Sequence, residues 1–412
     1  MKKQIYCLFI CVLVFGTAAG ASELNIGSAH EAVELGLKRN PEFQAQLDLL
    51  ESKKMLPQKL GGLSDPKVGI RLNGTPAKNM DYSFDQKRVF INQSFPFIGE
   101  LGRKKQLAEK EIELSRLDLE LIHNNIRLQI QTIYFDLVLN ESLTKIAQKN
   151  KQIFENIINI ADIKYRSGKT LQANVLKARV SKGRVDEQLL QLSHQKVKLT
   201  EELKKWMGVT SDTTLNVTLK YPEEFHLVVT DASKSTISNA LWVKKAQIIE
   251  DKADKMVAIE KDRYLPDFVA QIELWDNAGM DNQYAGQLAM SIPWFNGKNH
   301  ASVKEAEAIK QSKNESKNDV VNTISQRLTT GLSDLKTTLE TITLYEETIL
   351  KNAQLSLSSF QKAFEVDKAS FLDYFESENT LYDLEIQHAK LLNKKHVLHA
   401  QINALFAKGG AK

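Results

Sequence analysis

The distribution of proline most constrains what this chain of 412 residues can fold into. All eight prolines lie at positions 41, 57, 66, 76, 96, 222, 266 and 293, so residues 97–221 and 294–412 contain none. Proline breaks a helix interior because it lacks an N–H donor and clashes with the preceding turn. Glycine is also absent between Gly102 and Gly168. Both proline-free stretches are therefore predicted to form long helices.

Apolar residues at helical spacing over residues 103–164 support the first of these helices. They include Leu107, Leu114, Leu117, Leu121, Leu128, Ile133 and Leu137. Such a helix would be about 90 Å long at 1.5 Å per residue. Helices of this length occur in coiled coils and helical barrels, where they bury apolar stripes against one another. The turn signal Ser167-Gly168 then separates it from a helix over about 171–207, which predicts an antiparallel hairpin.

The second half of the chain repeats this plan, with helices expected over about 299–365 and 371–406 and a break between them. At a constant offset of 199 residues, the aligned pairs are Tyr165 with Phe364, Gly168 with Asp367, Asn174 with Asp373, and Leu176 with Phe375. Each half also has a lead-in helix, predicted over about 28–60 and 236–262. The chain therefore resembles a tandem duplication.

Two pairs of alternating segments follow the lead-in helices and predict β-hairpins. Their apolar positions are Val68, Ile70, Leu72, Val89, Ile91, Phe268, Ala270, Ile272, Leu274, Leu288, Met290 and Ile292. Each segment has about ten residues, the length that a tilted strand needs to cross a membrane. One apolar and one polar face would suit lipid on one side and water on the other. A half-buried sheet of a soluble protein shows the same alternation.

Four strands cannot close a barrel, because the smallest transmembrane barrels have about eight. An open sheet edge in lipid would leave backbone groups unpaired. If the strands are membrane-spanning, one chain must therefore pair with copies of itself, and three copies would supply twelve strands. The repeated sequences SFPFIGELG and SIPWFNGKN would then mark where each strand becomes a helix. Pro96 and Pro293 end the ladder by removing a donor, and Gly99 and Gly297 allow the turn.

The first residues have the pattern of a secretory signal, with Lys2 and Lys3, an apolar run from Ile5 to Phe15, and a small-residue site at 19–21. We expect cleavage after Ala21. Cys7 and Cys11, the two cysteines of the chain, lie in this segment, so the mature chain would have no disulfide and no thiolate metal site. The net charge of +4 would fall by two lysines to +2, which favours neither nucleic acid nor a strongly charged substrate.

At this point the chain resembles the TolC family of outer-membrane efflux proteins, over essentially all of residues 22–408. The likeness rests on the opening AHEAVELGLKRNPEFQAQ, the two hairpin–helix units, the turns YRSGKTLQANVLKAR and FEVDKASFLDYFESENTLY, and the repeat. The stretch QSFPFIGELGRKKQLAEKE is similar to members paired with heavy-metal-exporting pumps. The resemblance implies a homotrimer with a twelve-stranded β-barrel in the Gram-negative outer membrane and a long α-barrel in the periplasm.

In such an assembly the protein would be a passive exit duct for efflux or type I secretion, without enzymatic activity or cofactor. An inner-membrane pump of the RND or ABC type and a periplasmic adaptor would be its partners. The resemblance maps two pore-narrowing acids to Asp373 and Glu376, which would form carboxylate rings about a threefold axis. It maps the adaptor-contacting tips to Arg166, Ser167, Gly168, Lys169, Val366, Asp367 and Lys368. Asp367 departs from the family, which usually has glycine there.

Simpler alternatives remain open for each of these assignments. Asp373 and Glu376 would also fit a solvated helix face, and the two turns would also fit ordinary hairpin loops. His396 and His399 could share a metal at their i, i+3 spacing, but without an evident third ligand we expect surface histidines. A soluble periplasmic coiled-coil scaffold or adaptor is the alternative for the whole chain.

The predicted organisation is mostly α with a small β part. Its segments are a signal peptide (1–21), N-terminal helices (22–64), a first transmembrane β-hairpin (65–97), a first long helical hairpin (98–207), an equatorial mixed segment (208–235), a lead-in helix (236–263), a second transmembrane β-hairpin (264–296), a second long helical hairpin (297–408) and a tail (409–412).

Overall fold

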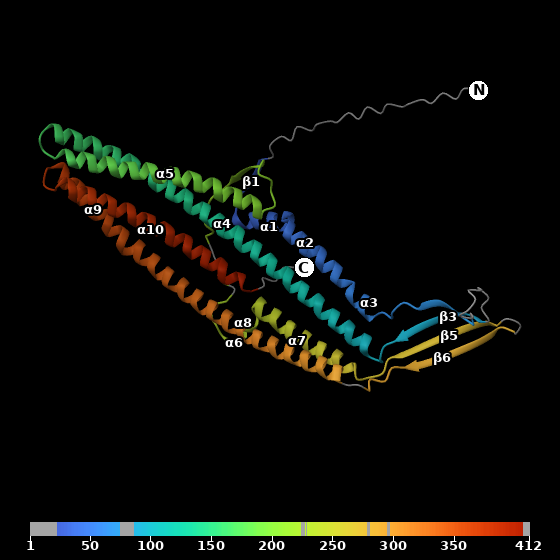
Figure 1. The fold of residues 1–412 in the computed structure, drawn as a ribbon. Coiled ribbons are helices and arrows are strands. Elements are labelled where there is room, and N and C mark those ends of the chain that lie inside the picture. The colour runs from blue at the N-terminus through green and yellow to red at the C-terminus, as the bar shows by residue number, and fades with distance from the viewer. Residues whose placement is uncertain are drawn as a thin grey trace, which may run out of the picture.

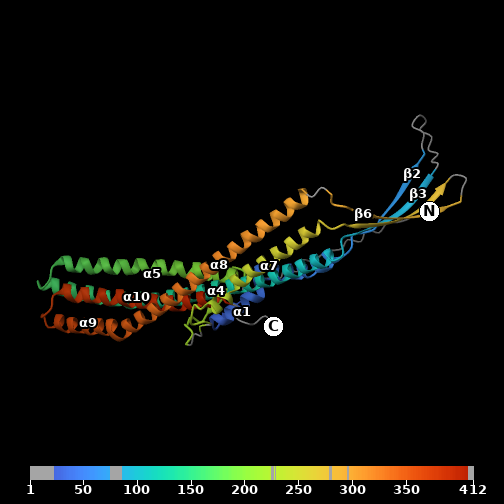
Figure 2. The same cartoon turned by 90° about the horizontal axis from the view of Figure 1, so that it is seen from below.

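The computed structural model describes residues 23–74, 86–223, 227, 229–277, 281–294 and 297–406. The expected signal and its cleavage site, most of the first hairpin loop, part of the second loop, Phe295 and the tail lie outside the described residues. The described chain is mostly helical, as predicted, with a smaller β part. It is strongly elongated, with strands at one end and two helical turns at the other (Figures 1 and 2).

The first half contains β1 (Glu23–Ile26), α1 (Ala29–Arg39), α2 (Pro41–Lys54), α3 (Leu56–Gly61), β2 (Lys67–Asn73), β3 (Gln86–Phe95), α4 (Glu100–Arg166) and α5 (Gln172–Trp206). The second contains β4 (Thr214–Val217), α6 (Lys234–Ser238), α7 (Leu241–Asp262), β5 (Phe268–Asn277), β6 (Gln283–Met290), α8 (Gly297–Leu344), the π-helical turn η1 (Tyr345–Ile349), α9 (Leu350–Glu365) and α10 (Phe371–Ala404). No helix in the described ranges is both long and apolar enough to cross a lipid bilayer.

The first lead-in helix is not continuous, contrary to our expectation for residues 28–60. Pro41 restricts the preceding residue to an extended conformation, and Asn40 accordingly ends α1 with φ −64° and ψ 122°. Its side-chain oxygen accepts from the backbone N–H of Glu42 at 2.9 Å and thereby caps α2. The Asn40 amide donates to the Trp206 carbonyl at 2.9 Å. One side chain therefore joins the start of α2 to the end of α5.

The helix predicted over 299–365 is likewise interrupted, here by η1. Leu328, Leu335 and Ile342 are buried at intervals of seven residues, whereas the next buried apolar residue of this segment, Phe364, lies one residue outside that register. A π-helical turn accommodates one extra residue in a helix. The turn at 345–349 therefore returns Phe364 to the face that packs on the neighbouring hairpin.

The helical body is held by apolar clusters, and the cluster near the turns joins the two halves. Near the turns, Phe154 of α4 and Val175 of α5 pack in one cluster with Phe371 and Phe375 of α10. Near the middle, α1, α4 and α5 share a second cluster, and α6, α8 and α10 share a third. The first and last elements of the described residues also meet this region, since β1 pairs parallel with β4 and Phe406 bridges to Ala240.

The two β-hairpins form one antiparallel sheet in the order β2-β3-β5-β6. The pairing of β3 with β5 runs from Gln86 opposite Asn277 to Phe95 opposite Phe268, so the two halves are joined at the strands as well as at the helices. β2 and β6 are the outer strands and have no partner on their far sides within this sheet. Along one face, apolar side chains such as Val68 and Leu288 are more than two-thirds exposed.

Candidate functional site

The two helical turns, which lie together at the end of the molecule farthest from the strands, share one backbone geometry (Figure 1). In the first turn the Lys169 N–H donates to the Lys164 carbonyl at 2.8 Å, and in the second the Lys368 N–H donates to the Ala363 carbonyl at 2.8 Å. This six-residue closure needs a left-handed residue after the helix. Gly168 (φ 72°) and Asp367 (φ 55°) occupy that position.

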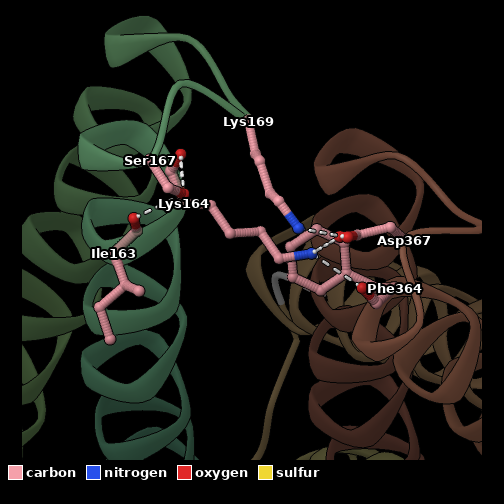
Figure 3. Close-up of polar contacts among 6 residues, drawn as sticks. All are labelled: Ile163, Lys164, Ser167, Lys169, Phe364 and Asp367. Carbon is pink, nitrogen blue, oxygen red and sulfur yellow. Dashed lines mark hydrogen bonds and ion pairs between the residues drawn. The ribbon is translucent and has the colours of Figure 1, made fainter.

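Asp367 connects the second turn to the first (Figure 3). Lys164 Nζ donates to one carboxylate oxygen at 2.7 Å, and Lys169 Nζ donates to the other at 2.7 Å. Lys164 also donates to the Phe364 carbonyl at 2.9 Å, and its ammonium lies 3.8 Å from the centre of the Phe364 ring. Hydrogen bonds from the two lysines lower the pKa of Asp367 to about 2.

The remaining predicted tip residues lie on the surface of the same two turns. Arg166 is exposed and forms an ion pair with Asp162 at 2.7 Å. The Ser167 hydroxyl donates to the carbonyls of Ile163 and Lys164. Val366 and Lys368 are exposed. The exposed surface of these turns is therefore apolar and basic, and it surrounds the contact of Asp367 with Lys164 and Lys169.

Asp373 and Glu376 are both exposed on the first turns of α10. They line one groove of about 270 Å³ with Phe360 and Thr380. The Asp373 carboxylate accepts from the Ser370 N–H at 3.1 Å, and the Ser370 hydroxyl accepts from the Asp373 N–H at 3.1 Å, which is a capping box. Glu376 lies 3.7 Å from Lys177 Nζ of α5. Both carboxylates thus have local partners.

The strand-to-helix junctions lie at the opposite end of the helices. Gly99, with φ 106°, precedes α4 and can adopt this left-handed conformation without strain, and Gly297 is the first residue of α8. Near Pro96, the Phe97 N–H donates to the Asp267 carboxylate at 3.0 Å. Near Pro293, the Ser291 N–H donates to the Asp267 carbonyl at 2.8 Å. Asp267 therefore bridges the two junctions.

Several residues that sequence reasoning did not find are central to this geometry. Lys164 contacts Asp367, and Lys177 contacts Glu376, but in each case the two partners lie about two hundred residues apart in the chain. Arg103 pairs with the buried Asp262 through two bonds of 2.5 Å and joins the start of α4 to the end of α7. The repeat offset of 199 residues was the sequence signal that could have paired the segments of Lys164 and Lys177 with their partners, whereas Arg103 and Asp262 are 159 residues apart and fall outside that offset.

The expectation of surface histidines was wrong. His396 and His399 are 4% and 6% exposed, because α10 buries them against α4 and the equatorial segment. The His396 ring stacks on Tyr221 at a centroid distance of 4.3 Å, and burial lowers its pKa to about 4. Among the described residues, no group of three or more potential ligands is arranged to hold a metal ion.

Comparison with known proteins gives one family match and a set of similar structures. Residues 232–407 match the family model described as outer membrane efflux protein. The cobalt-zinc-cadmium resistance protein CzcC of Cupriavidus metallidurans is 20% identical over 316 residues, which cover 75% of each chain. A crystal structure of CusC has a TM-score of 0.81 at 13% identity and covers 92% of both chains.

The outer membrane protein VceC of Vibrio cholerae has a TM-score of 0.77 at 15% identity, covering 92% of this chain and 96% of that one. At such identities the structural likeness establishes the fold: long helical hairpins joined to a four-stranded sheet. The second half of the chain is therefore similar to the outer membrane efflux protein family, and the described chain shares the fold of CusC and VceC.

Proposed function

We propose that the protein is a homotrimeric outer-membrane exit duct. It passively conducts substrates to the outside from an inner-membrane pump of the RND or ABC type and a periplasmic adaptor, in a tripartite efflux or type I secretion system. One observation carries the proposal: among the described residues, the four-stranded sheet has two unpaired edges, β2 and β6, and an exposed apolar face. Backbone groups at such edges must be paired in lipid, so further copies of the sheet are required.

The strand order of the sheet allows identical copies to close it into a barrel. Successive strands of the sheet are antiparallel, so β2 and β6 run in opposite directions. β6 of one copy can therefore continue the antiparallel ladder with β2 of the next, and three copies give the twelve strands expected from the family. The 67 residues of α4 correspond to about 100 Å of helix, a length suited to a periplasmic extension.

Within this duct, we assign the first turns of α10 to the entrance at the periplasmic end. Asp373 and Glu376 would form two carboxylate rings about the threefold axis and narrow the entrance. The exposed residues of the two turns, Arg166–Lys169 and Val366–Lys368, would contact the adaptor. Support comes from position: both groups lie at the end of the helices opposite the strands (Figure 2), and both carboxylates face one groove.

Single-channel recording in planar bilayers tests the duct and its entrance together. The wild-type protein should form channels whose current is blocked by multivalent cations added from the helical side, because carboxylate rings attract cations. Replacing Asp373→Ala with Glu376→Ala should weaken that block by about tenfold, a change of about 1.4 kcal/mol in binding free energy.

A matched control removes two exposed acids elsewhere. Asp212 and Glu223 lie in the equatorial segment, far from the turns, and both are exposed, so their double alanine variant should retain the block. A protein that forms no channels would overturn the duct. Unchanged block in the Asp373 and Glu376 variant would instead remove these two residues from the entrance.

A further inference from the structure

The polar face of the strand sheet carries a charged cluster near the ends of the strands farthest from the helices. The register places Arg71 opposite Arg88, and Arg88 opposite Trp275. Glu273 lies two residues before Trp275 on the same face of β5. Its side chain is only 9% exposed, although it stands on an open sheet of a single chain. Neighbouring side chains must therefore cover this carboxylate.

The contacts show how Glu273 is covered. Its carboxylate accepts from the Trp275 indole N–H at 2.9 Å and from the Gln271 amide. The guanidinium groups of Arg71 and Arg88 approach the two carboxylate oxygens at 3.7 and 3.6 Å. The Arg88 guanidinium also lies 3.7 Å from the centre of a Trp275 ring. One acid and one aromatic side chain thus fix the orientation of Arg88.

Positive charge remains in excess on this face. Within the strands, the polar face carries Lys67, Arg71 and Arg88 but only one acid, Glu273. Among the described residues, Arg88 Nε is buried and has no acceptor. Guanidinium groups recognise carboxylate and phosphate by paired N–H donors. The chemistry of the cluster therefore fits an anionic partner better than a cationic one.

We propose that Arg71, Arg88, Glu273 and Trp275, here named the exit cluster, form an anion-attracting ring on the channel wall near its outer mouth. This inference rests on the proposed function, since only a closed channel turns the polar face toward a lumen and the apolar face toward lipid. Each copy contributes two guanidinium groups and one carboxylate. Arg71 and Arg88 attract the anion, whereas Glu273 is a positioning residue that holds them against the wall.

Reversal potentials in a KCl gradient across planar bilayers measure the effect. Replacing Arg71→Gln with Arg88→Gln should lower the chloride-to-potassium permeability ratio about twofold or more, since charged rings set pore selectivity. Glu273→Gln should raise the ratio. Pyrophosphate added on the strand side should reduce the wild-type current, and the double arginine variant should lose that block.

Lys87→Gln is the matched control. Lys87 is adjacent to Arg88 in the sequence but lies on the opposite face of β3, where it is exposed beside Leu72 and Asp276. Its replacement removes one positive charge, as each arginine replacement does, and should leave the permeability ratio and the pyrophosphate block unchanged. If the double arginine variant does not insert, Arg71→Gln alone tests the ratio, because this side chain is 51% exposed and its loss disturbs little packing.

These measurements distinguish a failure of the exit cluster from a failure of the proposed duct, on which the exit cluster rests. Absence of channels from the wild-type protein overturns the proposed duct. Wild-type channels, with an unchanged permeability ratio in the arginine variants or an equal change in Lys87→Gln, overturn the exit cluster and leave the duct intact.

Discussion

At the residue scale, Asp367 shows how a residue other than glycine can occupy a left-handed turn position. The position requires φ near +55°, which costs most non-glycine residues about 1–2 kcal/mol. Aspartate is among the residues that tolerate this region. Lys164 and Lys169 then bind its carboxylate, so the aspartate adds contacts between the turns that a glycine could not make.

Replacing Asp367 with glycine or with alanine should separate these two contributions. Asp367→Gly should keep the turn and lose the contacts to Lys164 and Lys169. Asp367→Ala loses the same contacts and adds backbone strain, so it should be about 1 kcal/mol less stable than the glycine variant. Hydrogen exchange of the amides at 363–370 reports both effects. Equal exchange in the two variants would contradict the assigned strain.

The same contact has a defined pH dependence. The pKa of Asp367 is lowered from 3.8 to about 2, so the charged form is favoured by folding and its contribution is fully present above about pH 4. It should be lost as the pH falls from 3.8 towards 2. In Asp367→Asn, exchange at the turn should therefore lack the acid transition of the wild type over this range.

His396 should respond to acid over a higher range. Burial lowers its pKa from 6.5 to about 4, which means that the native state favours the neutral ring. Its contribution to stability is complete above about pH 6.5 and declines as the pH falls towards 4. His396→Phe, which keeps a ring against Tyr221, should flatten the fall of the thermal unfolding midpoint between pH 6.5 and 4. An unchanged slope would assign that fall to other groups.

At the scale of elements, the sequence predicts those helices and strands whose formation depends on residues close by in the chain. The absence of proline and the turn at Ser167-Gly168 indicate the first hairpin, which the structure places at Glu100–Arg166 and Gln172–Trp206. Alternation indicates the strands. The break at Asn40 follows from Pro41 and could have been predicted, whereas the π-helical turn at 345–349 depends on the register of Phe364 against a distant hairpin.

The residues of the candidate site also divide into those that the sequence predicts and those that depend on distant contacts. Gly168 and Gly99 are recognisable from sequence because left-handed backbone favours glycine. The contacts of Asp367 with Lys164 and of Glu376 with Lys177 join segments about two hundred residues apart, and no local pattern encodes them. The burial of His396 was missed for the same reason, since its covering residues come from α4 and the equatorial segment.

The ion pair of Arg103 with Asp262 joins α4 to α7, and its contribution to stability can be measured. Asp262 is 5% exposed and both its carboxylate oxygens bind Arg103. Arg103→Met would leave a buried carboxylate without its partner, which should cost about 2–3 kcal/mol of unfolding free energy. The adjacent surface pair of Lys104 with Glu100 provides a control, since Lys104→Met should cost less than about 1 kcal/mol. Equal losses in urea unfolding would contradict the assigned role.

At the scale of the whole molecule, a closed ring requires contact between the β2 and β6 edges of different copies. The expected loss of Cys7 and Cys11 with the signal would leave a mature chain suited to introduced cysteines. Ile70→Cys on β2 can be combined in turn with cysteine at Tyr284, Gly286 or Leu288 on β6, all on the same face of the sheet. Antiparallel neighbours lie about 5 Å apart, so at least one pair should form disulfides between chains.

Oxidation in mild detergent should therefore convert one of these pairs into covalent dimers and trimers on non-reducing gels. Ile91→Cys with Ile272→Cys is the control, because these residues are register partners within one chain and should cross-link without an increase in mass. The two experiments share the same sheet and differ only in whether the bond crosses the open edge. If all three β2–β6 pairs gave monomers while the control cross-linked, the sheet would be folded and its edges would not meet, so the closed ring would be wrong.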